Sequence, residues 1–242
     1  MSVVGNFLLN EIAQHRQAVL ARLQAACAAA GREPGAVRLL AVSKTFDADA
    51  VHQAWCDGQR EFGENYIQEG VDKIVRLSEC QPGGGWVWHC IGPVQSNKTR
   101  LVAEHFDWLH TVDRLKIAQR LNEQRPAHLP PLNVCLQVNI DGGDTKSGVA
   151  PNDALALAQA VLALPRLRLR GLMTIPDPVD DMVAVHTRAR VLFEDLQRAL
   201  VLPDFDTLSM GMSGDMDAAV QAGSTMVRVG SAIFGTRPPK TA

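Results

Sequence analysis

The sequence has few of the features that mark several large classes of protein. Its five cysteines are odd in number and widely spaced, and none forms a CxxC pair. This pattern argues against a disulfide framework and against a zinc site, and it favours a reducing, cytoplasmic location. No apolar run approaches the roughly 20 residues that a membrane-spanning helix needs. We therefore expect neither a secreted disulfide scaffold nor a membrane protein.

Neither positive nor negative residues are in large excess. The chain has 24 Lys and Arg against 26 Asp and Glu, a formal net charge of -2. This balance gives no general case for nucleic acid or an anionic membrane as a partner. The first residues lack a basic start followed by an apolar run, so no signal peptide is expected. Hydrophobic residues make up 46% of the 242 residues, which suffices for a sizeable core.

Strand-like and helix-like segments alternate along the chain. A long amphipathic helix is expected from Asn6 to about Ala30, and a helical segment follows each predicted strand. The short apolar segments that predict strands are residues 37–45, 60–64, 86–92, 107–113, 133–139, 167–174, 206–211 and 226–229. The alternation indicates a parallel α/β sheet.

Eight such repeats favour a single-domain (β/α)8 TIM barrel that spans residues 1–242, with an extra N-terminal helix in front. An open, doubly wound sheet is the alternative. That fold would want a glycine-rich turn after the first strand, and Lys44-Thr45-Phe46 contains no glycine.

The first strand ends abruptly at Lys44. Barrels and open α/β sheets place their chemistry at the C-terminal ends of the strands. Burial there would disfavour the charged form of the lysine, and a neutral amine attacks an aldehyde to form a Schiff base. On position alone, a solvated lysine at a strand end is the commoner case.

Two turns near the C-terminus have the pattern of an anion site. Ser213 precedes the short helix after the seventh strand, and Gly230-Ser231 precedes a helical turn after the eighth. Barrels often bind phosphate at these two loops, where helix N-terminal N–H groups carry partial positive charge. Plain helix capping is the alternative role for either serine.

Arg228 interrupts an otherwise apolar eighth strand. Arginine is rarely buried unless paired, so it is either a fixed cation that faces a ligand or a member of an internal ion pair. A lysine, an anion site and an arginine together suggest an aldehyde that carries a phosphate. Pyridoxal 5'-phosphate fits, with its aldehyde at Lys44 and its phosphate at Ser213 and Ser231.

Several motifs together resemble the pyridoxal phosphate homeostasis proteins, which have the alanine-racemase-like barrel called fold type III. The resemblance covers nearly the whole chain, although Cys90 and Val94 depart from the usual residues. The segments that carry it are residues 41–45, 62–66, 88–98, 146–148, 171–174, 208–215 and 227–235.

The resemblance implies cofactor-binding residues: Lys44, Asn65, Met210, Ser213, Arg228, Gly230 and Ser231. Lys44 would hold the cofactor, Asn65 would lie beside its ring, and the two serines with Gly230 would bind the phosphate. Arg228 would approach the pyridine nitrogen. An always-protonated guanidinium keeps that nitrogen unprotonated, so the ring would be a poor electron sink.

The expected function is that of a cytoplasmic carrier or buffer of pyridoxal phosphate in vitamin B6 homeostasis, without catalytic residues or a metal. A pyridoxal-phosphate-dependent amino-acid racemase is the alternative. The related racemase uses a second acid/base, a tyrosine from a further β domain, whereas this chain has one tyrosine, Tyr66, and no length left after the barrel. His89 and Cys90, at the end of the third strand, are the candidates to replace that tyrosine as the second acid/base.

The resemblance further suggests apoenzymes that depend on the cofactor as recipients, and a monomer is expected because the racemase's dimerising β domain is missing. Lys146 is either a second, transient site for the cofactor or an exposed loop lysine. An interaction surface formed by Lys98, Arg100 and the arginines of residues 166–170 is a third reading, against which the near-neutral charge argues.

Overall fold

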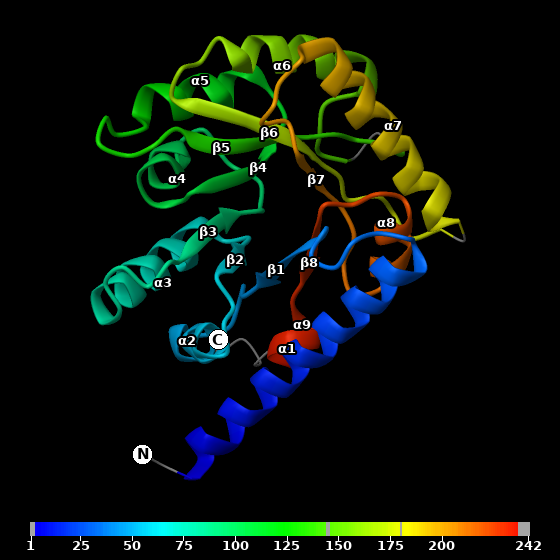
Figure 1. Ribbon diagram of the computed structural model, residues 1–242. Coiled ribbons are helices and arrows are strands. Elements are labelled where there is room, and N and C mark those ends of the chain that lie inside the picture. The colour runs from blue at the N-terminus through cyan, green and yellow to red at the C-terminus, as the bar shows by residue number, and fades with distance from the viewer. Residues whose placement is uncertain (1–2, 144–145, 180, 237–242) are drawn as a thin grey trace.

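Parallel strands close into a barrel (Figure 1) in the computed structural model, which describes residues 3–143, 146–179 and 181–236. Each strand pairs with the next, and β8 pairs with β1 to complete the circle. The strands are β1 (Arg38–Val42), β2 (Glu61–Glu64), β3 (Val87–Cys90), β4 (Trp108–Val112), β5 (Leu132–Gln137), β6 (Leu167–Met173), β7 (Thr207–Ser209) and β8 (Met226–Val229). The predicted closed barrel is confirmed, and the open sheet is excluded.

A ring of helices covers the outside of the barrel. They are α1 (Val3–Ala29), α2 (Ala48–Cys56), α3 (Ile67–Cys80), α4 (Thr99–His105), α5 (Leu115–Gln124), α6 (Ala154–Leu162) after the 3-10 turn η1 (Pro151–Asp153), α7 (Met182–Leu200), α8 (Met216–Gln221) and α9 (Ser231–Phe234). α4 begins at Thr99 and not earlier, because Gln95 and Ser96 form a turn in which their carbonyls accept from the Lys98 amide and the Thr99 hydroxyl.

The two faces of β1 bury different sets of residues. Leu39 and Ala41 join the large cluster formed with the helices, whereas Leu40 and Val42 belong to a separate cluster with Ile91 and Met226. Because side chains alternate along a strand, Leu40 and Val42 face the barrel interior. Full burial of a leucine such as Leu40 contributes about 2 kcal/mol. The strand that carries Lys44 at its end is therefore held on both faces.

The barrel interior also holds a chain of polar side chains. His89 Nδ1 lies 2.9 Å from His110 Nε2, and His110 Nδ1 lies 3.1 Å from the hydroxyl of Ser209. The other ring nitrogen of His89 lies 3.4 Å from a carboxylate oxygen of Glu61. Burial lowers the pKa of both histidines, so the rings are neutral at physiological pH. His89 thus lies inside the barrel, not at its mouth.

α1 precedes the barrel and lies along its outside, next to α8 and α9 (Figure 1). It is tied to the loop after α2 by Arg16, whose Nη1 lies 2.8 Å from a carboxylate oxygen of Asp57. The segment just after α1 is tied down by Arg32, which donates to the carbonyls of Val220 and Ser224 at the end of α8. The helix is therefore fixed to the barrel at its middle and just beyond its C-terminal end.

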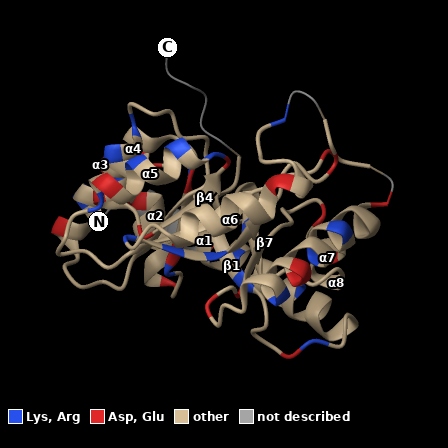
Figure 2. Ribbon diagram, turned by 90° about the horizontal axis from the view of Figure 1, so that it is seen from above, with Lys and Arg blue, Asp and Glu red and all other residues tan. Residues whose placement is uncertain are grey.

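Figure 2 shows that acidic and basic residues are interspersed along the helices and loops. The arginines of residues 166–170 illustrate this mixture of charges. Arg168 pairs with Asp204, and Arg170 pairs with Asp206. These arginines therefore do not form an uncompensated patch for an anion. Within the described residues, no helix combines the length and the apolarity needed to cross a membrane.

Candidate functional site

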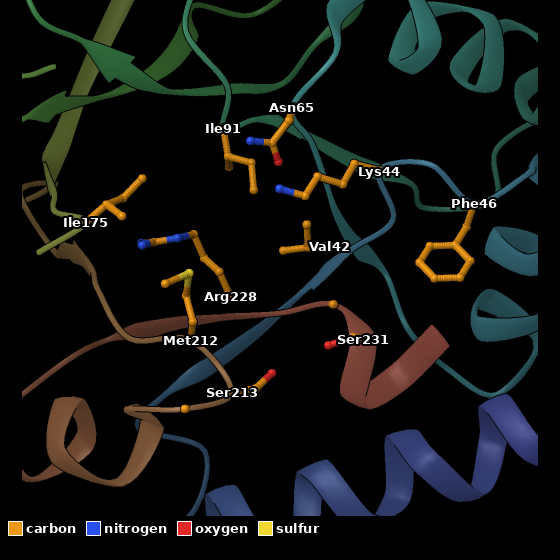
Figure 3. A pocket seen from close by; sticks show the side chains of 12 residues that line it. Val42, Lys44, Phe46, Asn65, Ile91, Ile175, Met212, Ser213, Arg228 and Ser231 are labelled. Carbon is orange, nitrogen blue, oxygen red and sulfur yellow. The ribbon is translucent and has the colours of Figure 1, made fainter. Parts of the chain in front are cut away.

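A cavity of about 390 Å³ opens at the C-terminal ends of the strands (Figure 3). This volume is within the range of roughly 300–1,000 Å³ that small-molecule sites occupy. The residues that line it are Val42, Lys44, Phe46, Asn65, Ile91, Ile175, Met212, Ser213, Gly214, Arg228, Gly230 and Ser231. The structure thus brings together every predicted site residue except Met210.

Lys44 follows β1 and projects into this cavity, where Figure 3 shows its end near Asn65 and Val42. The residue after it, Thr45, has a φ of 70°, in the left-handed region that a threonine rarely adopts. The Thr45 N–H donates to Glu69 Oε1 at 2.5 Å. This bond helps to hold the turn and with it the direction of Lys44.

A buried charge network lies behind that turn. Lys73 Nζ donates to Glu64 Oε1 at 2.8 Å, to Glu69 Oε1 at 2.7 Å and to the carbonyl of Ser43 at 2.8 Å. The Ser43 hydroxyl donates to the same Glu64 oxygen at 2.6 Å. Burial raises the pKa of Glu64, and the nearby ammonium of Lys73 opposes that rise. The network therefore fixes the residues on both sides of Lys44.

Lys73 and Glu69 were missed by sequence reasoning. Both lie on α3, where charged residues alternate with apolar ones, and such residues usually face solvent. Lys73 lies three residues after Gly70 and four before Leu77, on the inward side of the helix, but a lysine at such a position usually extends its charge to solvent.

Arg228 points from β8 into the same space as Lys44 (Figure 3). Its Nη1 donates to the carbonyl and the hydroxyl of Ser209 at 2.8 and 2.9 Å, and its Nη2 donates to the carbonyl of Thr174 at 2.9 Å. Burial lowers the pKa of Arg228 to about 10, so the guanidinium keeps its charge at neutral pH. No carboxylate of a described residue lies within ion-pair distance, so the cation is held by dipoles and faces the cavity.

We call the two turns that the sequence predicts to bind an anion, residues 213–214 and 230–231, the anion cradle. Their side chains and backbone line the cavity at the start of α8 and α9. A Cβ at Gly230 would lie 3.1 Å from the carbonyl oxygen of Val42, so the chain passes very close to β1 there. In the view of Figure 3, Ser213 and Ser231 both lie below Lys44 and Arg228.

Asp215 shapes the first of these turns. Its carboxylate accepts from the Met212 N–H at 2.7 Å and lies 2.9 Å from His186 Nε2. Burial raises the pKa of Asp215, but these hydrogen bonds outweigh it and hold the pKa below its usual range. The carboxylate is thus an internal support of the turn.

Asn65 contributes a polar atom that has no partner among the described residues. Its Oδ1 is buried, and the residue lines the cavity. The backbone of Asn65 packs closely against the segment after β3, where a Cβ at Gly92 would lie 2.0 Å from the Asn65 carbonyl oxygen. A buried acceptor without a partner is costly, so this atom favours a ligand or water that donates to it.

Met210 does not reach the cavity. Its side chain is fully buried in the cluster between the barrel and the helices, and its N–H donates to the carbonyl of Met226. The neighbouring Ser209 faces the interior instead, and alternation along the strand turns Met210 outward. Met212, two residues later, lines the cavity in its place.

The cavity has few groups for acid/base chemistry. Of the described residues that line it, Lys44 and Arg228 are the only ones with ionisable side chains. Tyr66 is 52% exposed and is not part of the lining. Cys90 is fully buried, and burial raises the pKa of its thiol to about 12. Neither His89 nor Cys90 is placed to act on a ligand in this cavity.

Lys146 lies at the edge of the site. Its ammonium is paired with Asp141 and Asp177, and it donates to the carbonyl of Ile175, a residue of the cavity wall. Partial burial lowers its pKa, but the bonds to the two carboxylates outweigh this and raise the pKa. The ion pairs therefore favour the protonated form, which cannot attack an aldehyde.

Comparison with known proteins places the chain in a family. The family model of the alanine racemase N-terminal domain matches residues 15–238. A pyridoxal phosphate homeostasis protein of Pseudomonas aeruginosa is 56% identical over 232 residues, which are 95% of this chain and 97% of that protein. The protein of the same name from Escherichia coli is 55% identical over 95% of this chain and 98% of its own length.

Solved structures agree with this relationship. PipY of Synechococcus elongatus, solved with PLP bound, is 34% identical with a TM-score of 0.80, over 93% of this chain and all of that one (100%). Alanine racemase of Corynebacterium glutamicum is 18% identical with a TM-score of 0.67, over 97% of this chain and 63% of that one, and shares the fold alone. The chain therefore belongs to the pyridoxal phosphate homeostasis protein family, whose barrel is that of the alanine racemase N-terminal domain.

Proposed function

We propose that this protein binds pyridoxal phosphate through a Schiff base at Lys44 and serves the intracellular balance of that cofactor as a carrier or buffer. The observation that carries the proposal is the meeting of an amine, a guanidinium and two serine turns around one cavity. These groups come from segments as far apart in sequence as Lys44 and Ser231. The PLP-bound structure of PipY supports the choice of ligand.

The residues present fit this cofactor. The turns at residues 213–214 and 230–231 would take the phosphate, and the buried Oδ1 of Asn65 would meet a donor beside the ring. The apolar side chains of Val42 and Ile91 give the flat ring an apolar contact. Pyridoxal phosphate supplies an aldehyde, and condensation with the Lys44 amine releases one water and forms a C=N bond.

Arg228 explains why binding need not lead to turnover. Its guanidinium stays protonated and can only donate hydrogen bonds, so it keeps a facing pyridine nitrogen unprotonated. A ring without that proton withdraws electrons weakly, and carbanions next to it are poorly stabilised. Together with the lack of a second acid/base in the described cavity wall, this supports a non-catalytic role.

The decisive test is where the cofactor attaches. Purified protein should be yellow, borohydride should fix the cofactor, and a peptide map should place the adduct on Lys44. Lys44→Ala should be colourless after loading, whereas Lys116→Ala, which removes an exposed lysine of α5, should load normally. Equal colour and equal affinity in Lys44→Ala would refute the assignment.

Amino-acid racemase activity is the second candidate, and the shared barrel of alanine racemase is the observation that favours it. A racemase needs an acid/base on each face of the substrate, and the described cavity wall offers Lys44 alone as a proton carrier near neutral pH. We therefore expect no racemisation across a panel of amino acids, followed by chiral chromatography. Turnover that disappears in Lys44→Ala would establish the enzyme instead.

The remaining parts of the proposal concern partners and place. We infer that the protein acts as a monomer in the cytoplasm. There it would deliver pyridoxal phosphate to apoenzymes that depend on this cofactor. A transient second attachment at Lys146 is tested by treating loaded Lys44→Ala protein with borohydride. The ion pairs with Asp141 and Asp177 lead us to expect no adduct at Lys146. An adduct there would show that the ion pairs open during release.

A further inference from the structure

Arg22, on the helix that precedes the barrel, reaches the anion cradle from outside. Its Nη1 donates to the carbonyl of Ser213 at 2.8 Å. The rest of the guanidinium pairs with Asp217 in the first turn of α8, with Nη2 2.7 Å from Oδ2 and Nε 3.3 Å from each oxygen. The planar guanidinium of Arg22 therefore donates hydrogen bonds from two of its edges, and these bonds fix its orientation.

This contact controls the peptide between Ser213 and Gly214. In a trans peptide the C=O and the following N–H point in opposite directions. Arg22 holds the Ser213 carbonyl toward α1, so the Gly214 N–H points the other way. In Figure 3, Ser213 lies between the α1 ribbon and Lys44, and Gly214 lines the cavity. The N–H is therefore directed to the side on which the phosphate would lie.

The hydrogen bonds between Met212 and Asp215 close this turn, but neither of them involves the peptide between Ser213 and Gly214. A Cβ built at Gly214 would meet nothing within 4 Å, so neighbouring atoms do not restrict it. A glycine also adopts many backbone conformations, and a flipped peptide would turn a carbonyl oxygen toward the anion. Arg22 opposes this flip, because the flip would break its hydrogen bond to the Ser213 carbonyl.

The effect should be local. α1 is attached elsewhere by Arg16 to Asp57 and by Arg32 to the carbonyls of Val220 and Ser224. Arg22 itself is partly exposed, at 45% of its side chain. Its removal should therefore leave the helix and the barrel in place.

We propose that Arg22 is a positioning residue that sets the Ser213–Gly214 peptide for a phosphate and so makes the site select the phosphorylated aldehyde over pyridoxal. The inference deepens the proposed function and rests on it. It gives the added N-terminal helix a role in ligand choice. The group recognised is the phosphate monoester, not the ring or the aldehyde.

The experiment titrates each protein with pyridoxal phosphate and separately with pyridoxal, and follows the Schiff-base absorption. Arg22→Met keeps the aliphatic stem and should weaken pyridoxal phosphate about tenfold, as expected for one charge-assisted hydrogen bond. Its affinity for pyridoxal should stay within about twofold, since pyridoxal has no phosphate. Arg22→Lys should recover part of the loss because it keeps a donor and a charge.

Two further variants separate positioning from general damage. Asp217→Asn removes the carboxylate that orients Arg22 and should show an intermediate loss of phosphate selectivity. Arg32→Met removes an arginine bound to the other end of α8 and should leave the selectivity unchanged. An unchanged ratio of the two affinities in Arg22→Met, or an equal loss of both, would overturn the inference.

The outcomes also separate this inference from the proposed function. If the unaltered protein forms no Schiff base with either aldehyde, the proposed function fails and the inference falls with it. If it binds pyridoxal phosphate at Lys44 and Arg22→Met keeps full selectivity, the role of Arg22 alone is rejected.

Discussion

Lys44 depends on residues that never touch the cavity. Lys73 links Glu64, Glu69 and the carbonyl of Ser43, and Glu69 in turn holds the N–H of Thr45. Because Thr45 adopts a φ of 70°, the turn is strained and persists only where its surroundings hold it. The turn that presents Lys44 is thereby held in place by the structure itself, so the proposed binding of an aldehyde would not have to order it.

Replacement of Lys73 by methionine should be strongly destabilising. It leaves the fully buried Glu64 without its cation, and loss of one partner of a buried pair costs about 3 kcal/mol or more. Urea denaturation should show this loss. Arg76→Met is the matched control on the same helix, since its pair with Asp49 is exposed and worth about 0–1 kcal/mol. Equal stabilities of the two variants would contradict the importance of the network.

Sequence reasoning found the site residues that interrupt a pattern. Lys44 and Arg228 are polar where their strands are apolar, and Ser213 and Ser231 stand where strands seven and eight end. Arg22 breaks no pattern, because it lies on an amphipathic helix and meets Ser213 only through a contact 191 positions away. Such a contact follows from the packing of α1 on α8, which no local pattern encodes.

Helices and strands were predicted in number and order, and their ends were predicted less well. β7 is the shortest strand, Thr207–Ser209, whereas residues 206–211 were expected, because the chain turns into the anion cradle after Ser209. Met210 was assigned to the site for the same reason. A shift of one residue along a strand moves a side chain to the opposite face, and the structure puts Met210 against the helices.

α7 ends on a residue poorly suited to its conformation. Val201, the C-cap, has φ 50° and ψ 47° and is 81% exposed. A branched residue in this left-handed region costs roughly 1–2 kcal/mol, whereas glycine pays no such penalty. Val201→Gly should therefore raise the free energy of unfolding by about 1 kcal/mol, measured by urea denaturation.

The control for this substitution lies on the same helix. Val191 is 51% exposed in the interior of α7, where glycine is a poor helix former. Val191→Gly should lower the stability by roughly 0.5 kcal/mol. A loss of stability in both variants would show that the αL position does not strain the native chain.

The stability of the barrel should depend on pH because two histidines, His89 and His110, are buried in its interior. Burial lowers the pKa of His89 and His110; the cations of Arg38 and Arg228 lower it further at His110, and Glu61 only partly offsets the shift at His89. Below the unfolded-state value of about 6.5, the unfolded chain therefore binds protons that the folded chain does not. This part of the stability is present above about pH 6.5 and is lost as the pH falls toward the lowered pKa values.

Acidification from pH 7 to pH 5 should accordingly reduce the free energy of unfolding, with a slope of up to about 1.4 kcal/mol per pH unit for each ring. Replacement of both histidines by glutamine should flatten the slope in urea denaturation. His128→Gln, at an exposed position, should keep it. An unchanged slope in the double variant would show that the buried rings do not govern the acid response.

At the scale of the molecule, the barrel brings an amine, a guanidinium and two turns to one cavity, and α1 supports the turns from outside. The most direct test is a crystal structure of the protein with pyridoxal phosphate. We predict continuous density from Lys44 Nζ into the ring, Arg228 facing the ring nitrogen, and the phosphate within hydrogen-bond distance of Ser213 and Ser231. A Lys44 side chain turned to solvent, or a phosphate away from both serine turns, would contradict the account.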